Sequence, residues 1–187
     1  MSADNTTFNY TQFKMTGKIA ASGNCNALWN YENLNSPLKT RCGSNMFYNC
    51  SSLTTAPELP ATELAEYCYQ YMFYNCTSLT TAPELPATTL AEYCYTYMFQ
   101  NCTALTTAPI LPATELAYNC YFYMFNGCTS LNYIKCLATD ISARDCSTGW
   151  VYNVANIGTF IKHPDMNGWT AGINGIPDGW TIVDYVE

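Results

Sequence analysis

Residues 71–95 read YMFYNCTSLTTAPELPATTLAEYCY, and almost the same wording occurs three times in a chain of 187 residues. Three columns of identical residues recur at a fixed step of 26: Met46, Met72, Met98 and Met124; Leu53, Leu79, Leu105 and Leu131; and Leu59, Leu85, Leu111 and Leu137. A unit this short cannot bury its own apolar side, but stacked copies can cover one another. The sequence therefore predicts a solenoid in which equivalent side chains lie one above the next.

Each repeat divides into a predicted helix and an extended segment. One column of residues that favour a helix N-cap sets the unit boundaries: Ser36, Thr62, Thr88, Thr114 and Asp140. The five units are 36–61, 62–87, 88–113, 114–139 and 140–165. At about 100° per residue, the apolar side chains between Leu64 and Asn75 gather on one face, so we expect a short helix there. Residues 77–87, TSLTTAPELPA, are expected to be extended because Pro83 and Pro86 forbid a helix.

The beginning of the chain differs from the repeats and is expected to act as a cap. NCNAL at 24–28 echoes NCSSL at 49–53, which indicates a half repeat before the first full one. The residues from Phe8 to Ile19 are strand-like and are expected to cover that end. Residues 1–35 are therefore predicted to form an N-terminal cap with a half repeat.

The five repeats occupy residues 36–165, and a different pattern follows them. Residues 158–162, GTFIK, form a more conventional strand, and a final strand is expected around Trp180 to Val183. Residues 166–187 are therefore predicted to form a C-terminal β cap. We expect caps and repeats together to make a single structural domain.

The stretch YMFYNCTSLTTAPELPA (71–87) resembles the BspA-like leucine-rich repeats of bacterial surface proteins, whose units carry Phe-x-x-Cys-x-x-Leu before a strand. The 26-residue step and the Met-Phe pair also resemble the bacterial surface-protein 26-residue repeat, and the likeness covers about residues 24–165. The resemblance implies an α/β fold, a right-handed leucine-rich-repeat solenoid with one short helix and one short strand per unit. It also implies a bacterial surface role of the adhesin type.

The extended segment departs from the pattern of that family. Where such repeats carry Leu-x-x-Ile-x-Ile-Pro, residues 79–86 read LTTAPELP, with one extra residue and an internal proline at Pro83. Proline lacks the N–H that a paired strand donates. We therefore expect the parallel sheet of this solenoid to be incompletely paired.

Charge excludes two classes of partner. The formal net charge is −7, and no Lys or Arg lies between Arg41 and Lys135, whereas six Glu do. Nucleic acids and anionic membranes attract clustered cations, so we expect neither as a partner. No apolar run reaches the roughly 18 residues of a membrane span, so no membrane insertion is expected.

The first residues lack the basic and apolar regions of a signal peptide, so either export uses another route or Met1 begins a processed fragment.

Ten of the eleven cysteines fall into two columns: Cys42, Cys68, Cys94, Cys120 and Cys146; and Cys25, Cys50, Cys76, Cys102 and Cys128. Side chains in register point the same way, which is poor geometry for a disulfide, and five members per column cannot all pair. Zinc is disfavoured because the chain has no CxxC motif and a single histidine, His163. Reduced thiols that fill the core are the main expectation, with disulfides and a metal site as alternatives. Cys136 stands outside both columns, either as a reactive thiol or as an ordinary strand residue.

Candidate binding residues emerge from comparing the copies within this one chain. The helical positions that vary between copies are also those that the helical wheel places outward. Two interpretations stay open: drift at solvated positions, or a recognition face, since tyrosine gives a large contact area at low entropic cost. On the second interpretation, the binding face on the convex helical side comprises Tyr67, Gln70, Tyr74, Tyr93, Thr96, Gln100, Tyr118, Phe122 and Asn126.

Other residues of each repeat are constant. Two sets of tyrosines flank the candidate face and are expected to stack between coils as structural ladders: Tyr69, Tyr95 and Tyr121; and Tyr71, Tyr97 and Tyr123. The strand side, with Thr80, Thr81, Glu84 and their equivalents, is the other candidate face. Its uniformity suits a repetitive ligand such as a glycan.

The sequence favours non-enzymatic binding. His163 precedes Pro164 and has no evident nucleophile partner, so we expect an exposed turn histidine. No phosphate loop, nucleophile elbow or zinc signature occurs, so we expect no enzyme and no cofactor. The predicted function is a repeat module that presents a Tyr-rich surface to a protein or glycan partner, as part of an extracellular bacterial surface protein or a phage virion protein. The alternative is a structural spacer or assembly module that contacts sister subunits in a homo-oligomer or a larger fibre.

Overall fold

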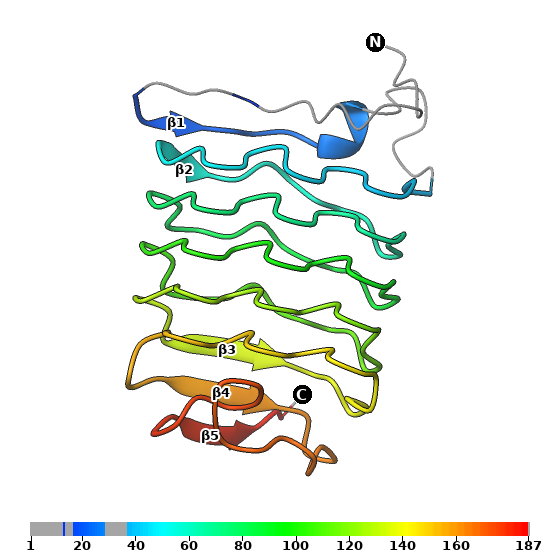
Figure 1. Cartoon of the computed structure of the whole chain (residues 1–187), viewed down its shortest axis with the longest axis vertical. Coiled ribbons are helices and arrows are strands. Elements are labelled where there is room, and N and C mark those ends of the chain that lie inside the picture. Colours follow the sequence, from blue (N-terminus) through cyan, green and yellow to red (C-terminus); the bar gives the residue numbers. More distant parts are fainter. Residues whose placement is uncertain (1–12, 14–16, 29–36, 187) are drawn as a thin grey trace.

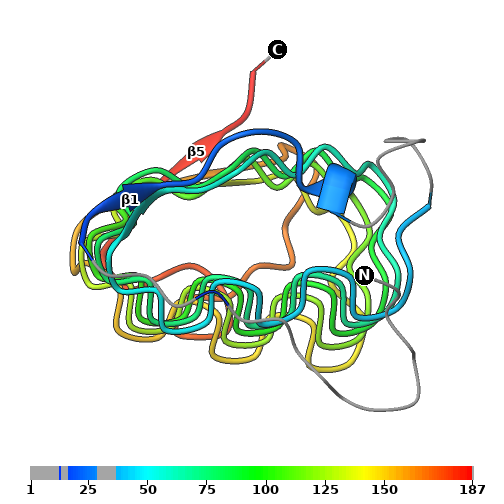
Figure 2. The same ribbon diagram turned by 90° about the horizontal axis from the view of Figure 1, so that it is seen from above.

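The chain winds into a stack of coils. The structure, a computed structural model of the whole chain, describes residues 13, 17–28 and 37–186. Successive coils lie one beyond another in Figure 1, and their outlines nearly superpose in the view from above in Figure 2. The elements within the described residues are short: β1 (Ile19–Ala20), the 3-10 helix η1 (Cys25–Leu28), β2 (Leu53–Thr55), β3 (Tyr133–Cys136), β4 (Thr159–Lys162) and β5 (Thr181–Asp184).

The predicted columns form real stacks inside the coils. The methionine column is buried throughout, at Met46, Met72, Met98 and Met124. Ring centroids are 5.4–5.7 Å apart along the next column, Phe47, Phe73, Phe99 and Phe125. Residues 26 apart therefore lie over one another, which confirms the predicted stacking. One apolar core runs the length of the stack.

The prediction of a helix from Leu64 to Asn75 is wrong. Residues 66–75 form consecutive turns, and no α-helix occurs in the part of the chain that the structure describes. The backbone angle φ is positive at every fourth residue of each such stretch: Arg41, Asn45, Asn49; Tyr67, Tyr71, Asn75; Tyr93, Tyr97, Asn101; Asn119, Tyr123, Gly127; and Asp145, Gly149, Asn153. It is also positive at Gly43 and Tyr69. A left-handed residue interrupts an α-helix. The backbone therefore bends in and out with a period of four residues. We call this path the wave, and it is seen as regular humps along the lower side of Figure 2.

Backbone hydrogen bonds between coils stabilise this wave. Alternate residues donate their N–H to the carbonyl 25 positions later, in the next coil, as Tyr71 does to Thr96 at 3.0 Å. The residues between them donate to the carbonyl three positions earlier, as Met72 does to Tyr69 at 3.1 Å. Both sets of N–H groups are thereby paired, as buried backbone requires. The turn side of the stack thus carries a ladder of inter-coil hydrogen bonds.

The strand side is regular only near the two ends of the stack. There, β1 pairs with β2, and β3, β4 and β5 form a three-stranded sheet, all parallel. Between them, the described coils meet through single bridges such as that of Thr55 with Thr81. A proline column explains the difference, because Pro57, Pro83 and Pro109 occupy the positions that Lys135, Ile161 and Val183 hold in β3, β4 and β5. The expectation of an incompletely paired sheet is confirmed.

Two predicted columns are shifted in the fourth and fifth coils. Leu111 pairs with Cys136 and not with Leu137, because the segment that leads through β3 lacks one residue of the LTTAPELP pattern. The N–H of Thr139 donates to the carbonyl of Thr114, just as that of Thr88 donates to Thr62. Thr139, and not Asp140, therefore continues the threonine column. These residues precede turns and not helices, so their prediction as N-caps is wrong; Ser36 lies outside the described residues.

The predicted half repeat at the N-terminal end is also shifted. Ile19 pairs with Leu53, and Asn24 pairs with Glu58. Cys25 therefore falls in register with Leu59, so the predicted correspondence of 24–28 with 49–53 is wrong. Phe13 extends the phenylalanine column, 5.3 Å from the ring of Phe47, whereas Phe8 lies outside the described residues.

Tryptophans close the C-terminal end. Trp150 is fully buried where the repeats carry Met, and its Nε1 donates to the carbonyl of Gly175 at 2.8 Å. Trp169 stacks on it with ring centroids 5.4 Å apart. The final strand, expected around Trp180 to Val183, is found as β5.

Candidate functional site

The turn side of the stack presents an aromatic surface. Along the wave, side chains alternate two inward and two outward, so that Met72 and Phe73 are buried while Tyr71 and Tyr74 are half-buried. We call the outward aromatic residues the tyrosine face; all are half-buried: Tyr48, Tyr67, Tyr71, Tyr74, Tyr93, Tyr97, Tyr118, Phe122 and Tyr123. The fold therefore gathers into one surface residues that are up to 75 positions apart in the chain.

The rings of the tyrosine face stack along the coil axis. The centroid distances are 4.6 Å for Tyr71 with Tyr97, 4.7 Å for Tyr67 with Tyr93, 4.7 Å for Tyr48 with Tyr74, and 5.4 Å for Tyr97 with Tyr123, with interplanar angles from 6° to 18°. Offset ring pairs of this kind are favourable beyond the area that they bury. Each ring thus uses its flat faces on its neighbours, and its edge remains for a partner.

The ends of the ring columns are covered as well. The guanidinium of Arg41 lies 4.3 Å from the ring centroid of Tyr67, and that of Arg144 lies 5.9 Å from the ring centroid of Tyr118. The backbone of Gly149 packs against Tyr123, where a Cβ atom would stand 2.9 Å from the ring. Little flat aromatic surface is therefore left open on this face.

The structure brings the predicted binding residues onto this surface, with one exception. Tyr67, Tyr74, Tyr93, Tyr118 and Phe122 belong to the tyrosine face, and Gln70, Gln100 and Asn126 are half-buried beside it. The exception is Thr96, which is 2% exposed and donates its hydroxyl to the carbonyl of Asn119 at 2.5 Å. Thr96 stands in the same outward column as Gln70 and Phe122, but its short side chain is covered and bonds to the neighbouring coil.

Sequence reasoning missed part of the tyrosine face. Tyr71, Tyr97 and Tyr123 stack as predicted, but they are half-buried members of the surface and not only internal supports. By contrast, Tyr69, Tyr95 and Tyr121 are 1–2% exposed and belong to the core. The available signal was the four-residue spacing of Tyr67, Tyr71 and Asn75, which places them on the same side of the wave.

Amide side chains line the tyrosine face. The Nδ2 group of Asn75 donates to Oδ1 of Asn49 at 3.0 Å, and Nε2 of Gln100 donates to Oδ1 of Asn126 at 2.9 Å. Both bonds run between neighbouring coils and fix otherwise flexible side chains. The surface is therefore ordered in its polar as well as its aromatic part.

The strand side offers a plainer surface. A depression of about 290 Å³ crosses two coils and is lined by Thr80, Thr81, Ala82, Thr106, Thr107, Ala108 and Pro109. None of these side chains is charged, and the lining nearly repeats from one coil to the next. This depression is the second candidate site.

The cysteine columns take part in the hydrogen bonding of the core. Three thiols donate from Sγ to the carbonyl of a phenylalanine in the preceding coil, at 3.0–3.1 Å: Cys76 to Phe47, Cys102 to Phe73, and Cys128 to Phe99. Burial raises the pKa of Cys76 and of Cys128 to about 12. A thiol must lose its proton to act as nucleophile or metal ligand, so these groups are chemically quiet.

Cys136 is an ordinary strand residue. It lies in β3, is fully buried, and burial raises its pKa to about 12. Its alternative interpretation as a reactive thiol therefore finds no support. Within the described ranges, no group of three His, Cys, Asp or Glu side chains is placed to hold a metal ion.

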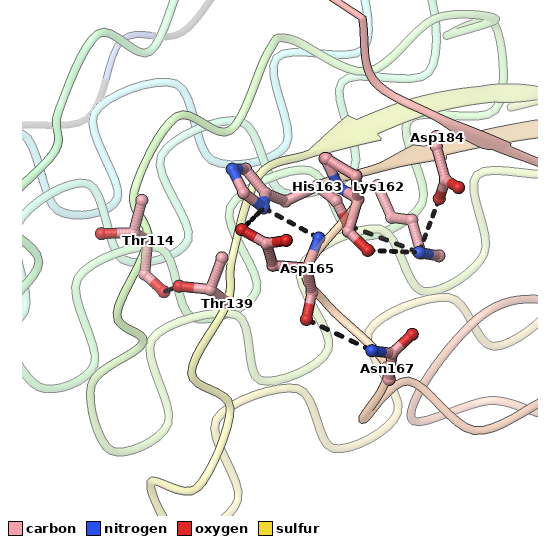
Figure 3. Close-up of polar contacts among 8 residues, drawn as sticks. Thr114, Thr139, Lys162, His163, Asp165, Asn167 and Asp184 are labelled. Carbon is pink, nitrogen blue, oxygen red and sulfur yellow. Dashed lines mark hydrogen bonds and ion pairs between the residues drawn. The ribbon is translucent and has the colours of Figure 1, made fainter.

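A small polar cluster surrounds the single histidine. Nδ1 of His163 accepts a hydrogen bond from the backbone N–H of Asp165 at 3.2 Å, which closes a turn after β4 (Figure 3). Nearby, Nζ of Lys162 lies 2.6 Å from Oδ1 of Asp184 in β5. The histidine is half-buried rather than exposed. These contacts join the last two strands and their turn, which is a structural role.

Comparison with known proteins identifies the family of these repeats. The model of the BspA type leucine-rich repeat region matches residues 24–146 in six copies, whereas no curated protein and no solved structure matches the chain. Repeats of this type typically occur in surface proteins, and leucine-rich repeats are generally non-enzymatic protein-interaction modules. In the residues described, no helix has the length and apolar character to cross a membrane. From its matched repeats and the stacked columns that they build, the chain belongs to the BspA-type leucine-rich repeat family.

Proposed function

We propose that this chain is a non-enzymatic binding module of a bacterial surface or phage virion protein, and that its tyrosine face docks a protein partner. The observation that carries the proposal is the construction of that face. Its rings are held by stacking at 4.6–5.4 Å, so little side-chain entropy is lost when a partner binds. Recognition surfaces are enriched in tyrosine for this reason.

The covered ring faces favour a protein over a glycan on this surface. A sugar ring binds an aromatic side chain by lying flat on it, and here neighbouring rings, Arg41 and Gly149 occupy those flat faces. Ring edges together with the amides of Gln100 and Asn126 suit the mixed polar and apolar groups of a protein. A glycan is the second candidate ligand, and the threonine-lined depression of the strand side is the site that it fits.

A binding screen with face-specific variants tests this proposal. The chain is applied to arrays of host proteins and of glycans, and each ligand found is measured again with Tyr74→Ala, Gln70→Ala and Phe122→Ala. Central contacts of an interface cost about 2 kcal/mol or more on truncation, so we expect roughly thirtyfold weaker protein binding. Thr81→Ala, which alters only the strand side, is the matched control.

The outcomes separate the two faces. Loss of protein binding with the tyrosine-face variants and not with Thr81→Ala supports the proposal. If those three variants leave every detected ligand unaffected, the tyrosine face is not the binding surface. Loss with Thr81→Ala alone assigns binding to the strand side. Urea unfolding of each variant shows that the fold is intact, because Phe122 also contacts Tyr97 and Tyr123.

A further inference from the structure

The strand β5 is paired along one edge only. It runs parallel to β4, with Thr159 opposite Thr181 and Lys162 opposite Asp184, and no described residue pairs with its other edge. Figure 1 shows β5 as the last strand of the stack, and in Figure 2 it leads out of the common outline of the coils. All its residues are exposed, among them Ile182 at 53% and Val183 at 42%.

The backbone of β5 shows which groups this free edge offers. The N–H of Thr181 donates to Gly158 at 2.9 Å, and that of Tyr185 donates to Lys162 at 2.7 Å, both towards β4. Because alternate residues of a strand point their backbone groups to opposite sides, Ile182 and Asp184 direct their N–H and C=O groups outward. An unpaired edge of this kind pairs readily with another strand.

This edge is also held firmly in place. Nε1 of Trp180 donates to the carbonyl of Ala155 at 2.7 Å, immediately before the strand begins. At its other end, Asp184 forms the ion pair with Lys162, and Nζ of Lys135 lies 3.6 Å from the ring centroid of Tyr185. A partner therefore meets an ordered strand, and ordering it costs no further entropy.

We propose that β5 is a dimerisation edge, which pairs antiparallel with β5 of a second copy of this chain across a twofold axis. With Ile182 opposite Ile182 of the second copy, the two residues exchange both of their outward backbone hydrogen bonds. Thr181 then lies opposite Val183 of the other copy, and the two Asp184 carboxylates lie at opposite ends of the pair, so like charges do not meet. The sheet of β3, β4 and β5 thereby continues into the second copy, and the twofold contact closes on itself.

The oligomeric state of the full chain tests this inference. In light scattering coupled to size exclusion, we expect the mass of two 20.9 kDa chains at high concentration. Ile182→Lys places a charge at the centre of the contact and should restore the mass of one chain. Ile110→Lys is the matched control, since Ile110 is also 53% exposed but lies in the repeats, and this variant should keep the mass of two chains. A wild-type chain that stays single at every concentration, or an Ile182→Lys variant that keeps the double mass, overturns the proposal.

A cross-link tests the orientation. Directly opposed residues of an antiparallel, hydrogen-bonded pair have Cα atoms about 5.5 Å apart, inside the range that a disulfide spans. Mild oxidation of Ile182→Cys should therefore link two chains through the introduced thiols, whereas Ile110→Cys should stay unlinked. If wild type is a dimer and Ile182→Cys does not cross-link, the antiparallel register is wrong. The test is independent of the tyrosine face and of any ligand.

Discussion

The middle coils and the last coils of this protein have a common core but differ in how they are joined. Between residues 62 and 113 the turn side carries the inter-coil hydrogen bonds, and the strand side contributes only isolated bridges. From β3 to β5 the strand side forms a regular parallel sheet. Between the coils of β3 and β4 the turn-side ladder runs beside it, and the regular bonds of that ladder end with the one from Gly127 to Tyr152. One continuous ladder is therefore enough to join a coil to its neighbour.

The sequence of the strand segment decides whether a strand-side ladder forms. Residues 131–136, LNYIKC, follow the family pattern Leu-x-x-Ile-x and form β3, whereas LTTAPELP at 79–86 has Pro83 and one residue more. Proline cannot donate to a ladder. The extra residue changes the step from 26 to 25 where this segment meets β3, at the pair of Leu111 with Cys136. The middle coils then depend on their turn side, where Asn and Tyr adopt the left-handed conformation.

High pH should separate the two regions most strongly, by unfolding the middle coils first, because β4 and β5 contain neither Cys nor Tyr. Burial raises the pKa of Cys76 from its ordinary value of 9.0 to about 12, and that of Tyr71 from 10.0 to about 12. The folded-state pKa exceeds the unfolded one, so this stabilisation is complete below pH 9 and is lost as pH rises through 12. We expect loss of far-ultraviolet circular dichroism before the emission change of Trp150, Trp169 and Trp180.

Two controls make the alkaline experiment specific. A Trp29→Phe background confines tryptophan emission to the C-terminal end of the chain. Cys76→Ala removes one titrating group, so stability should fall less steeply with pH in this variant than in the parent. A single transition seen equally by both signals would show that the middle and the end unfold as one unit.

Ile161→Pro should weaken the C-terminal sheet severely. This substitution introduces a proline into β4, at the position where the middle coils already carry Pro83 and Pro109. The N–H of Thr159 donates to Asn132, on the β3 side, so by alternation that of Ile161 also faces β3. Its loss leaves a ladder acceptor unpaired, and we expect a cost of about 1–3 kcal/mol in urea unfolding. Ile161→Val keeps the N–H; if it is as costly as Ile161→Pro, the sheet is not what joins these coils.

Gly149→Ala should weaken the turn side by a smaller amount. Gly149 has φ of 62°, and the new Cβ would stand 2.9 Å from the ring of Tyr123. The left-handed conformation costs an alanine about 1–2 kcal/mol, to which displacement of the ring adds. Gly17→Ala is the control, because Gly17 has φ of 83° and open space around it. Equal losses of unfolding free energy in the two variants would mean that contact with Tyr123 contributes nothing.

The columns of this fold could be predicted, but the backbone between them could not. Apolar residues four apart, such as Cys68, Met72 and Cys76, fit a helix and a wave of period four equally well. The distinguishing signal was the column in which Asn75 and Asn101 give way to Gly127, since asparagine and glycine are the residues that most readily accept positive φ. The candidate face was found because its tyrosines lie outward on either model. Thr96 was misplaced because its short side chain is buried, although Gln70 and Phe122 in the same column are half-buried.

Pro83→Ile should have the smallest effect on stability. It tests directly whether proline is the reason that the middle coils lack a regular sheet. The restored N–H finds no complete ladder, because Pro57 and Pro109 still interrupt the neighbouring coils. The unfolded chain meanwhile gains the freedom that proline denied it, so we expect a loss of about 0.4–1 kcal/mol in urea and no new strand signal in the infrared amide I band. Replacing all three prolines by isoleucine should add that signal, since adjacent coils can then donate to one another. No new strand signal from the triple variant would show that the extra residue, and not the proline column, keeps the middle coils unpaired.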